Sequence, residues 1–340
     1  MVAHPIPSRE ITHRADVAPR GPFLTRWERV RHRQAHWMAE CVAETLGVFL
    51  YVYAGVGSQA PYVLGNILGR PDLGSLFTVG FAYALGIALA LIVSSGTSGG
   101  HFNPAVSITF VLFKGMPKRK AARYIVAQLL GGYIACLLIY LQYHHMIKLA
   151  EAALVDAGTT DTLFSPTGPA GIFALYLTPG ASLGQVFVNE FVCDFVLGVV
   201  IWTCLDPTNF FSPPAAAPWI IGMTYALVIW GYSPVSISAN AARDLGGRLT
   251  ALTIWGRGAA GGRYAAISAL TNIPATISAA AFYEFWLGDT SRVVTPIHMD
   301  FIAAHAAHAE HVVNKNQVSG AGSGSSIESG TVQVEALQKS

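Results

Sequence analysis

Long apolar runs separated by short polar segments make up most of the chain. Six of these runs approach the roughly 20 helical residues that cross a hydrocarbon layer of about 30 Å. Because backbone polar groups find no water inside that layer, each run is predicted to be an α-helix. The six predicted spans have the approximate bounds 37–56, 76–95, 124–143, 183–204, 214–232 and 264–286.

Two further apolar segments, 102–113 and 241–254, are too short to cross the layer alone. The first would form a helix of roughly 15–18 Å, about half of the hydrocarbon thickness, and the second has a similar length. An asparagine precedes the apolar run of each segment, Asn103 in the first and Asn240 in the second. Asparagine is a favourable N-cap, so we expect two half-length helices that begin at these residues.

The two halves of the chain repeat this arrangement. The first span reads AETLGVFLYVY from Ala43 and the fourth reads NEFVCDFVLGVV from Asn189, which puts Glu44 and Glu190 at matching places. Three spans per half make the second half enter the membrane from the opposite side, as in an inverted repeat. The predicted fold is therefore an all-α membrane protein with six transmembrane helices and two re-entrant half-helices.

The composition favours a membrane protein over a large soluble one. Of the 340 residues, 52% are hydrophobic and 12% are charged, whereas soluble globular proteins carry about 25% charged residues. The net charge of +2 gives no reason to expect a nucleic-acid partner. The four cysteines lie in or beside apolar segments with no CxxC pair, so we expect buried thiols, no metal and no cofactor.

The placement of lysine and arginine predicts the orientation. Residues 1–36 hold seven arginines and three acids, and residues 114–123 hold five basic residues and no acid. Such segments face the cytoplasm under the positive-inside rule, and six spans then put both termini there. We expect a cytoplasmic tail over 1–36, a membrane-spanning domain over 37–286 and a disordered cytoplasmic tail over 287–340. The N-terminal arginines could contact anionic lipid, although a solvated flank that sets topology also accounts for them.

The C-terminal tail contains a histidine series with helical spacing. His305, His308 and His311 could bind a metal or sense pH. No cysteine or acid completes a tetrahedral set at a clear spacing, so an exposed tail feature is the simpler interpretation.

The two short segments carry the chemistry of a transport site. A helix N-terminus has about half a positive charge, so two that meet near the midplane would oppose cations and protons. The amide NH₂ groups of the two asparagines would donate hydrogen bonds to a passing solute, and interrupted segments at matching places mark such a site. The candidate midplane residues are Asn103, Pro104, Ala105, Asn240, Ala241 and Ala242.

Arg243 follows Asn240 by three residues, which is about one helical turn. A buried arginine in a membrane is costly, so it is expected to line a wet cavity or to pair. A solvated arginine at the bilayer edge is the alternative. Asp244 is expected to pair with a neighbouring base such as Arg248, or to cap backbone, rather than to contact the solute.

Three acids lie well inside the predicted spans, away from their ends: Glu44, Glu190 and Asp194. Such carboxylates could relay protons. Non-helical backbone at membrane depth needs hydrogen-bond partners, however, so we expect Glu44 and Glu190 to accept bonds from the re-entrant loops. His101 is expected either to line the inner mouth of a pore or to pack against its neighbours.

Two stretches resemble the signature loops of the major intrinsic protein family, the aquaporins and aquaglyceroporins. SGGHFNPAVSITF, from Ser98, is similar to the first loop, and NAARDLGGRL is similar to the second, with Ala241 and Gly247 in place of two prolines. Asp244 after the arginine is typical of the glycerol-conducting branch. The long tails and the NAA variant are most similar to fungal members, and the resemblance covers about residues 37–286.

The resemblance implies a homotetramer in the plasma membrane, with one pore per subunit and a constriction near its outer mouth. The four constriction positions correspond to Tyr83, Val228, Ile237 and Arg243. Glycerol channels usually have tryptophan at the Tyr83 place and an aromatic at the Ile237 place. Strict water channels have a histidine on the fifth span, so this constriction follows neither pattern.

Together these features predict a passive channel for water and small uncharged solutes such as glycerol, which excludes ions and protons. The unusual constriction leaves open a pore mainly for hydrogen peroxide, ammonia, carbon dioxide or urea. A proton-coupled secondary transporter that uses the buried acids is the alternative from another class. No nucleophile–base pair or metal set appears inside the spans, so an enzyme is not expected.

Overall fold

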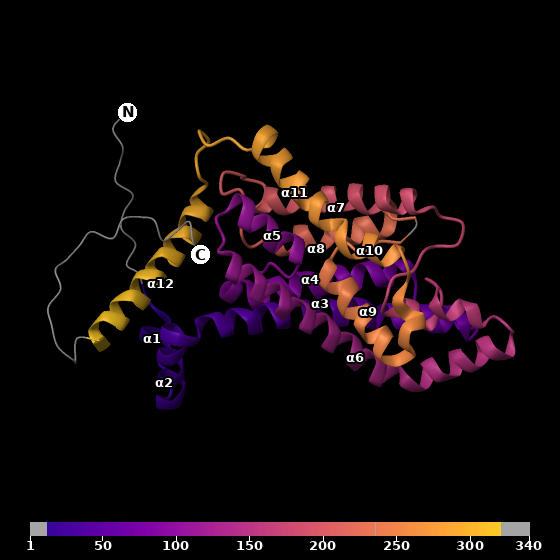
Figure 1. The fold of residues 1–340 in the computed structure, drawn as a ribbon. Helices are drawn as coiled ribbons and strands as arrows, with labels where there is room; N and C mark the ends of the chain where they lie inside the picture. The colour runs from indigo at the N-terminus through magenta and orange to yellow at the C-terminus, as the bar shows by residue number, and fades with distance from the viewer. Residues whose placement is uncertain (1–11, 235, 321–340) are drawn as a thin grey trace.

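Every regular element in the described part of the chain is a helix, as the apolar pattern predicted. Figure 1 shows the long helices side by side in one bundle, with α2 (Pro22–Val30) and α12 (Pro296–Gly320) at the same end. The computed structural model describes residues 12–234 and 236–320, so 1–11, 235 and 321–340 lie outside it. The helices of the bundle are α3 (His36–Ile67), α4 (Leu76–Ser98), α5 (Pro104–Phe113), α6 (Lys118–Asp156), α7 (Leu183–Leu205), α8 (Ala217–Leu227), α9 (Ala241–Trp255), α10 (Tyr264–Leu270) and α11 (Asn272–Phe282).

Five helical stretches of the described chain are long and apolar enough to cross a membrane. The predicted fifth span, 214–232, appears instead as a shorter apolar helix, Ala217–Tyr232, which ends in a π-helical turn. At 1.5 Å per residue this helix reaches about 24 Å, less than the roughly 30 Å of hydrocarbon. The five long stretches are His36–Ile67, Pro71–Ser98, Lys118–Asp156, Leu183–Leu205 and Tyr264–Leu287.

Two of the long helices run well past their predicted ends. The apolar pattern predicts that α6 ends near residue 143, but it continues to Asp156, and Gly158 then adopts a positive φ of 68°. In the same way α3 continues to Ile67 with Pro61 inside it. Apolar length measures only the part in lipid, whereas a helix continues into water until a residue such as glycine ends it.

The contacts between helices come in matching pairs, as two repeated halves would give. In the first half α3 packs against α4 and α6, and in the second α7 packs against α8 and α11. Between the halves α9 packs against α6, and α5 packs against α11. Each short helix therefore lies against the third long segment of the opposite half, and this places α5 and α9 inside the bundle.

Glycines let α9 approach α6 closely. A Cβ atom at Gly246 would lie 2.7 Å from the carbonyl carbon of Gly132, and one at Gly132 would lie 2.7 Å from the carbonyl oxygen of Ala242. Both obstacles are backbone atoms, so no side-chain rotation would relieve the clash. Small residues at such crossings let membrane helices pack by van der Waals contact.

Part of the segment expected as a disordered tail, 287–340, is helical: α12 occupies Pro296–Gly320, and 321–340 lie outside the described residues. Proline at the first helical position and the alanine-rich run after it favour a helix, although the segment lies beyond the apolar spans. The His308 ring lies 5.8 Å from the ring of His32, which brings α12 against the N-terminal segment. Within residues 12–234 and 236–320, no three His, Cys or acidic side chains gather as a metal site.

Replacing Gly246 by alanine is expected to destabilise the fold by about 1–3 kcal/mol, because overpacking against backbone relaxes poorly. Gly96 on α4 has no atom within 4 Å of such a Cβ, so Gly96→Ala is the matched control. Thermal unfolding in detergent, followed by loss of the size-exclusion peak, should show a lower midpoint for Gly246→Ala alone. Equal midpoints for both variants and the parent would contradict the close crossing.

Candidate transport pore

Both half-length helices begin at the predicted asparagines. Oδ1 of Asn103 accepts a hydrogen bond from the backbone N–H of Ala105 at 2.9 Å, and Oδ1 of Asn240 accepts one from Ala242 at 2.8 Å. Each asparagine therefore caps its own helix and satisfies a backbone donor that has no partner inside the helix. The first helical residues are Pro104 and Ala241, both buried.

The same two asparagines also join the helices to each other. Nδ2 of Asn103 donates to the carbonyl oxygen of Ala239 at 3.1 Å, and Nδ2 of Asn240 donates to that of Phe102 at 2.8 Å. Phe102 and Ala239 both have left-handed backbone, with φ of 49° and 56°. This conformation costs a non-glycine residue roughly 1–2 kcal/mol. The left-handed conformation occurs at the residue before each asparagine. The two loops of the junction therefore match in backbone conformation as well as in hydrogen bonds.

Glu44 fixes the loop that leads into α5. Its carboxylate accepts hydrogen bonds from the backbone N–H groups of His101 at 3.0 Å and Phe102 at 2.8 Å. It also accepts from the Ser98 hydroxyl and the Gln128 amide, each at 2.7 Å. A buried carboxylate with four donors holds this irregular backbone at a depth where water cannot serve as its partner.

Glu190 has the matching place in the second half but fewer partners. Its carboxylate accepts from the backbone N–H groups of Ser238 at 2.6 Å and Ala239 at 3.3 Å. Asp194, one turn further along α7, is 2% exposed, and its carboxyl oxygens have no hydrogen-bond partner within the described residues. Asp194 borders neither of the two cavities described next.

Two cavities lie on either side of the asparagine junction. The His101 cavity is bordered by His101, Asn103 and apolar side chains such as Leu91. The Arg243 cavity is bordered by Arg243, Tyr83, Gln59 and Ile237 on the other side. The two cavities share three lining residues, Tyr51, Tyr225 and Asn240, which therefore stand where one cavity gives way to the other.

His101 both lines its cavity and packs against its neighbours, so the two expectations for this residue are not exclusive. Its ring centroid lies 4.3 Å from that of Phe110 and 5.3 Å from that of Tyr124. Its Nδ1 lies 3.1 Å from the hydroxyl of Ser107.

Arg243 is 4% exposed and is held by three neutral acceptors. Its Nε donates to the Tyr83 hydroxyl at 3.1 Å, and its two terminal nitrogens donate to the Phe173 carbonyl at 2.7 Å and to Oε1 of Gln59 at 3.2 Å. These bonds occupy three of the five N–H donors of the guanidinium without cancelling its charge. In the described chain no carboxylate forms an ion pair with it.

Arg248, five residues further along the same helix, is surrounded by groups that neutralise its charge. Its guanidinium lies 2.9 Å from the carboxylate of Asp244, which is fully buried. It also donates to the Leu175 carbonyl at 2.9 Å. One arginine of α9 is therefore neutralised and structural, whereas Arg243 keeps its charge beside a cavity.

The apolar wall of the Arg243 cavity includes Ile237 and Val228. Val228 is only 1% exposed and packs among Cys193, Leu197 and neighbouring residues. Ile229 also borders this cavity and is less buried than Val228. The π-helical turn that begins at Val228 lets two successive residues of this segment reach the same cavity.

Sequence reasoning missed Gln59 and Tyr51, although α3 carries a signal for both. Gly47, Tyr51, Gly55 and Gln59 recur every four residues, so they share one face of the helix. A Cβ atom at Gly47 would overlap the ring of Phe102, and one at Gly55 would overlap that of Tyr83. The glycines admit rings from other segments, and the residues between them reach the cavities.

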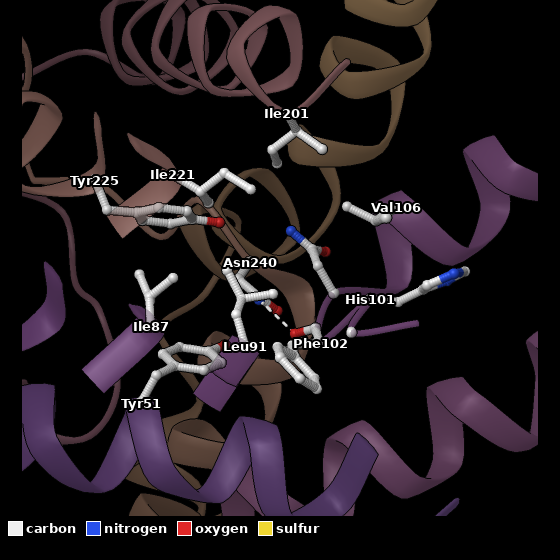
Figure 2. Close-up of a pocket in the computed structure, with 12 residues that line it drawn as sticks. Tyr51, Ile87, Leu91, His101, Phe102, Val106, Ile201, Ile221, Tyr225 and Asn240 are labelled. Atoms are coloured by element: carbon white, nitrogen blue, oxygen red, sulfur yellow. Dashed lines mark hydrogen bonds between the residues drawn. The ribbon is translucent and has the colours of Figure 1, made fainter. Parts of the chain in front are cut away.

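Tyr225 was also missed, and Figure 2 shows why it belongs to the site. The side chains of Tyr51 and Tyr225 extend from their helices toward the space that Asn240 borders. The Tyr51 hydroxyl is buried and has no hydrogen-bond partner in the described part of the protein. A buried hydroxyl without a partner is rare in a folded protein, and this one belongs to a residue that borders both cavities.

These features define a helical integral membrane protein with cavities on both sides of two meeting half-length helices. The chain matches the family model described as Major intrinsic protein over residues 31–287. The chain therefore belongs to the major intrinsic protein family, and the resemblance of its two loops to that family is confirmed.

Individual relatives agree with this assignment. The chain is 56% identical to Aquaporin-3 of Laccaria bicolor over 304 residues, which cover 88% of this chain and 92% of the relative. It is 35% identical to the Glycerol uptake facilitator protein of Pseudomonas aeruginosa, over 64% of this chain and 76% of the relative. Its fold is similar to the X-ray structure of the aquaglyceroporin from Plasmodium falciparum, with a TM-score of 0.63, 22% identity, and coverage of 74% of this chain and 97% of that one.

Replacing Glu44 by alanine is expected to leave four donors without an acceptor, at about 1–3 kcal/mol for each one that stays buried. The variant should unfold at a lower temperature and reach the membrane in smaller amounts. Glu44→Gln keeps one acceptor oxygen and should lie between the parent and Glu44→Ala. Unfolding midpoints in detergent test this order, and a midpoint for Glu44→Ala equal to that of the parent would contradict the role of the carboxylate.

Proposed function

We propose that this protein is a passive channel that conducts water and small uncharged solutes such as glycerol and excludes ions and protons. The observation that carries the proposal is the junction where Asn103 and Asn240 border a cavity. A side-chain amide has two N–H bonds, and each asparagine donates one of them to the opposite loop. We propose that the second N–H meets a solute oxygen and so offsets the hydration that the solute loses in an apolar passage. At Asn103 the solute would share this side chain with Tyr225, which is hydrogen-bonded to it.

Positive electrostatic potential at two levels supports the exclusion of cations and protons. At the junction, α5 and α9 direct two helix N-termini at the passage, each with about half a positive charge. At the constriction, Arg243 adds a full charge that no carboxylate neutralises. Uncharged solutes meet these groups as hydrogen-bond donors, whereas a cation meets them as a barrier.

We further propose six spans, with Ala217–Tyr232 as the shorter fifth, and both termini in the cytoplasm. The common end of the bundle that carries α2 and α12 supports this topology (Figure 1). The domain division at 36 and 286, a homotetrameric assembly and a plasma-membrane location belong to the same proposal, and family membership supports them.

A pore mainly for other small neutral solutes, such as hydrogen peroxide, is the second candidate. It is favoured by the constriction, where Tyr83 and Gln59 both occupy donors of Arg243 and leave fewer of them for a polyol. A proton-coupled transporter is less well supported. Its acids would be Glu44 and Glu190, which are occupied by loop donors, or Asp194, which borders neither cavity.

Stopped-flow light scattering on proteoliposomes tests the channel proposal. Water and glycerol flux of the parent should not change with an imposed pH step, because a passive pore needs no proton gradient. Flux that follows the proton gradient would instead favour the transporter. Measuring hydrogen peroxide permeability in the same vesicles distinguishes the two pore candidates, because a pore mainly for other neutral solutes should conduct peroxide better than glycerol.

Arg243→Ala is expected to admit protons and alkali cations that the parent excludes. A unit charge at 4 Å contributes about 1–4 kcal/mol in wet surroundings, which corresponds to about tenfold or more in cation permeability. Arg243→Lys keeps the charge and serves as the matched control. Dissipation of a pH gradient in the same vesicles measures the proton permeability. An Arg243→Ala variant that excludes protons as well as the parent does would show that the barrier lies elsewhere.

We also propose that the Tyr51 and Tyr225 hydroxyls form polar contacts for solute hydroxyls at the junction. Tyr51→Phe and Tyr225→Phe each remove one such partner with little change in volume. A lost hydrogen bond of about 0.5–1.5 kcal/mol should lower glycerol permeability relative to water by roughly 3- to 10-fold.

Tyr53→Phe is the matched control, since the Tyr53 hydroxyl bonds to Gln142 at 2.9 Å and borders neither cavity. The ratio of glycerol to water permeability should be unchanged in Tyr53→Phe. An unchanged ratio in both Tyr51→Phe and Tyr225→Phe would remove the two hydroxyls from the solute path.

A further inference from the structure

The N-terminal helix α2 presents an apolar face that no other part of the described chain covers. Phe23, Leu24, Trp27 and Val30 recur at helical spacing and are 81%, 47%, 44% and 43% exposed. None of the nine residues of α2 is buried. An aromatic and aliphatic stripe in this state is costly in water, so it indicates a surface that covers it.

Two basic side chains follow one edge of this apolar face. Arg26 is three residues after Phe23 and flanks the face, whereas Arg29 lies further round the helix, away from the apolar side chains, and both are exposed. Glu28, the one acid of the helix, lies 3.6 Å from Arg20 and 3.7 Å from His32, so its charge is already engaged. The helix therefore combines an apolar face with an uncompensated positive charge, which is the composition of helices that lie in an anionic lipid interface.

The position of α2 in the fold places it at the level of lipid headgroups. A π-helical turn, Arg31–Ala35, connects it directly to the membrane-spanning helix α3. The exposed apolar side chains of α3 begin at once, with Trp37 and Met38. Arg123 lies 4.9 Å from the Trp37 ring, so an aromatic and a basic side chain meet at this level, as they do at membrane interfaces.

The orientation of α2 is also consistent with a position at the level of the lipid headgroups. It runs across the line of α3 and projects from the end of the bundle (Figure 1). The residue before α3, Ala35, leaves helical geometry at φ −122° and ψ 16°, and this bend allows the change in direction. A helix that runs across a spanning helix, at its end, lies along the membrane surface rather than through it.

We propose that α2 is an interfacial anchor that binds the anionic cytoplasmic leaflet. Phe23, Leu24 and Trp27 enter the boundary between headgroups and acyl chains, and Arg26 and Arg29 contact the headgroup charges. The lipid surface is the occupant because the apolar face continues the lipid-facing surface of α3 and because the basic side complements acidic headgroups. This proposal does not depend on which solutes the pore conducts.

The test uses the full-length protein in nanodiscs and an environment-sensitive dye on a single cysteine. Cys41 is half-buried and is first replaced by serine, while the other three cysteines are buried. The dye is placed at Phe23→Cys on the apolar face or at Arg29→Cys on the opposite face. Because α2 buries no residue, both proteins should fold, and their size-exclusion profiles and water permeability provide the check.

Lipids brominated near the top of the acyl chains should quench the dye at residue 23 more than at residue 29, by about twofold or more. Replacing phosphatidylserine by phosphatidylcholine in the discs should weaken the quenching at residue 23. Equal quenching at both positions would overturn the proposal. A blue shift at residue 23 without lipid quenching would also overturn it, because a protein surface, such as a second copy or a tail, would then cover the face.

Discussion

Two hydrogen bonds that cross between the halves of the chain hold the centre of this protein. Each runs from a helix-capping asparagine to the carbonyl of the residue before the other cap, Asn103 to Ala239 and Asn240 to Phe102. Both acceptors sit on left-handed backbone that is unfavourable by itself. The strain persists because Glu44 and Glu190 bind the N–H groups of the same loops. This one junction holds the N-termini of α5 and α9 together, and with them the two asparagine amides beside the cavities.

The surroundings of Arg243 show how a charge can persist inside a helical bundle. An arginine paired with an acid, such as Arg248 with Asp244, is stable but contributes little field. Arg243 is instead held by a hydroxyl, a carbonyl and an amide oxygen, so its position is fixed while its charge persists. Two arginines five residues apart on α9 thus differ: Arg248 is paired within the fold, whereas Arg243 keeps its charge beside a cavity, where we propose that it sets the barrier.

The two halves are related but not equivalent, both in the carboxylates that hold their loops and in the side chains that line the cavities. Glu44 has four donors and Glu190 has two, while Asp194 in the second half has no partner among the described residues. Tyr51 on α3 and Tyr225 on α8 place hydroxyls at the junction. A repeated scaffold therefore carries an asymmetric lining, which lets selectivity change without altering the helix packing that supports it.

The sequence by itself determined the helical membrane fold, the two short helices that begin at Asn103 and Asn240, and the asparagine caps of both. These features follow from apolar length and local capping, which are properties of short stretches. It did not determine that Gln59 and Tyr83 hold Arg243, that Tyr51 and Tyr225 meet at the junction, or that residues 296–320 form a helix beyond the apolar spans. The partners of Arg243 lie 70 to 184 positions away along the chain. Only the tertiary packing of α3, α4 and α9 brings such groups within hydrogen-bond distance, because no local pattern encodes which distant side chain will face a given helix.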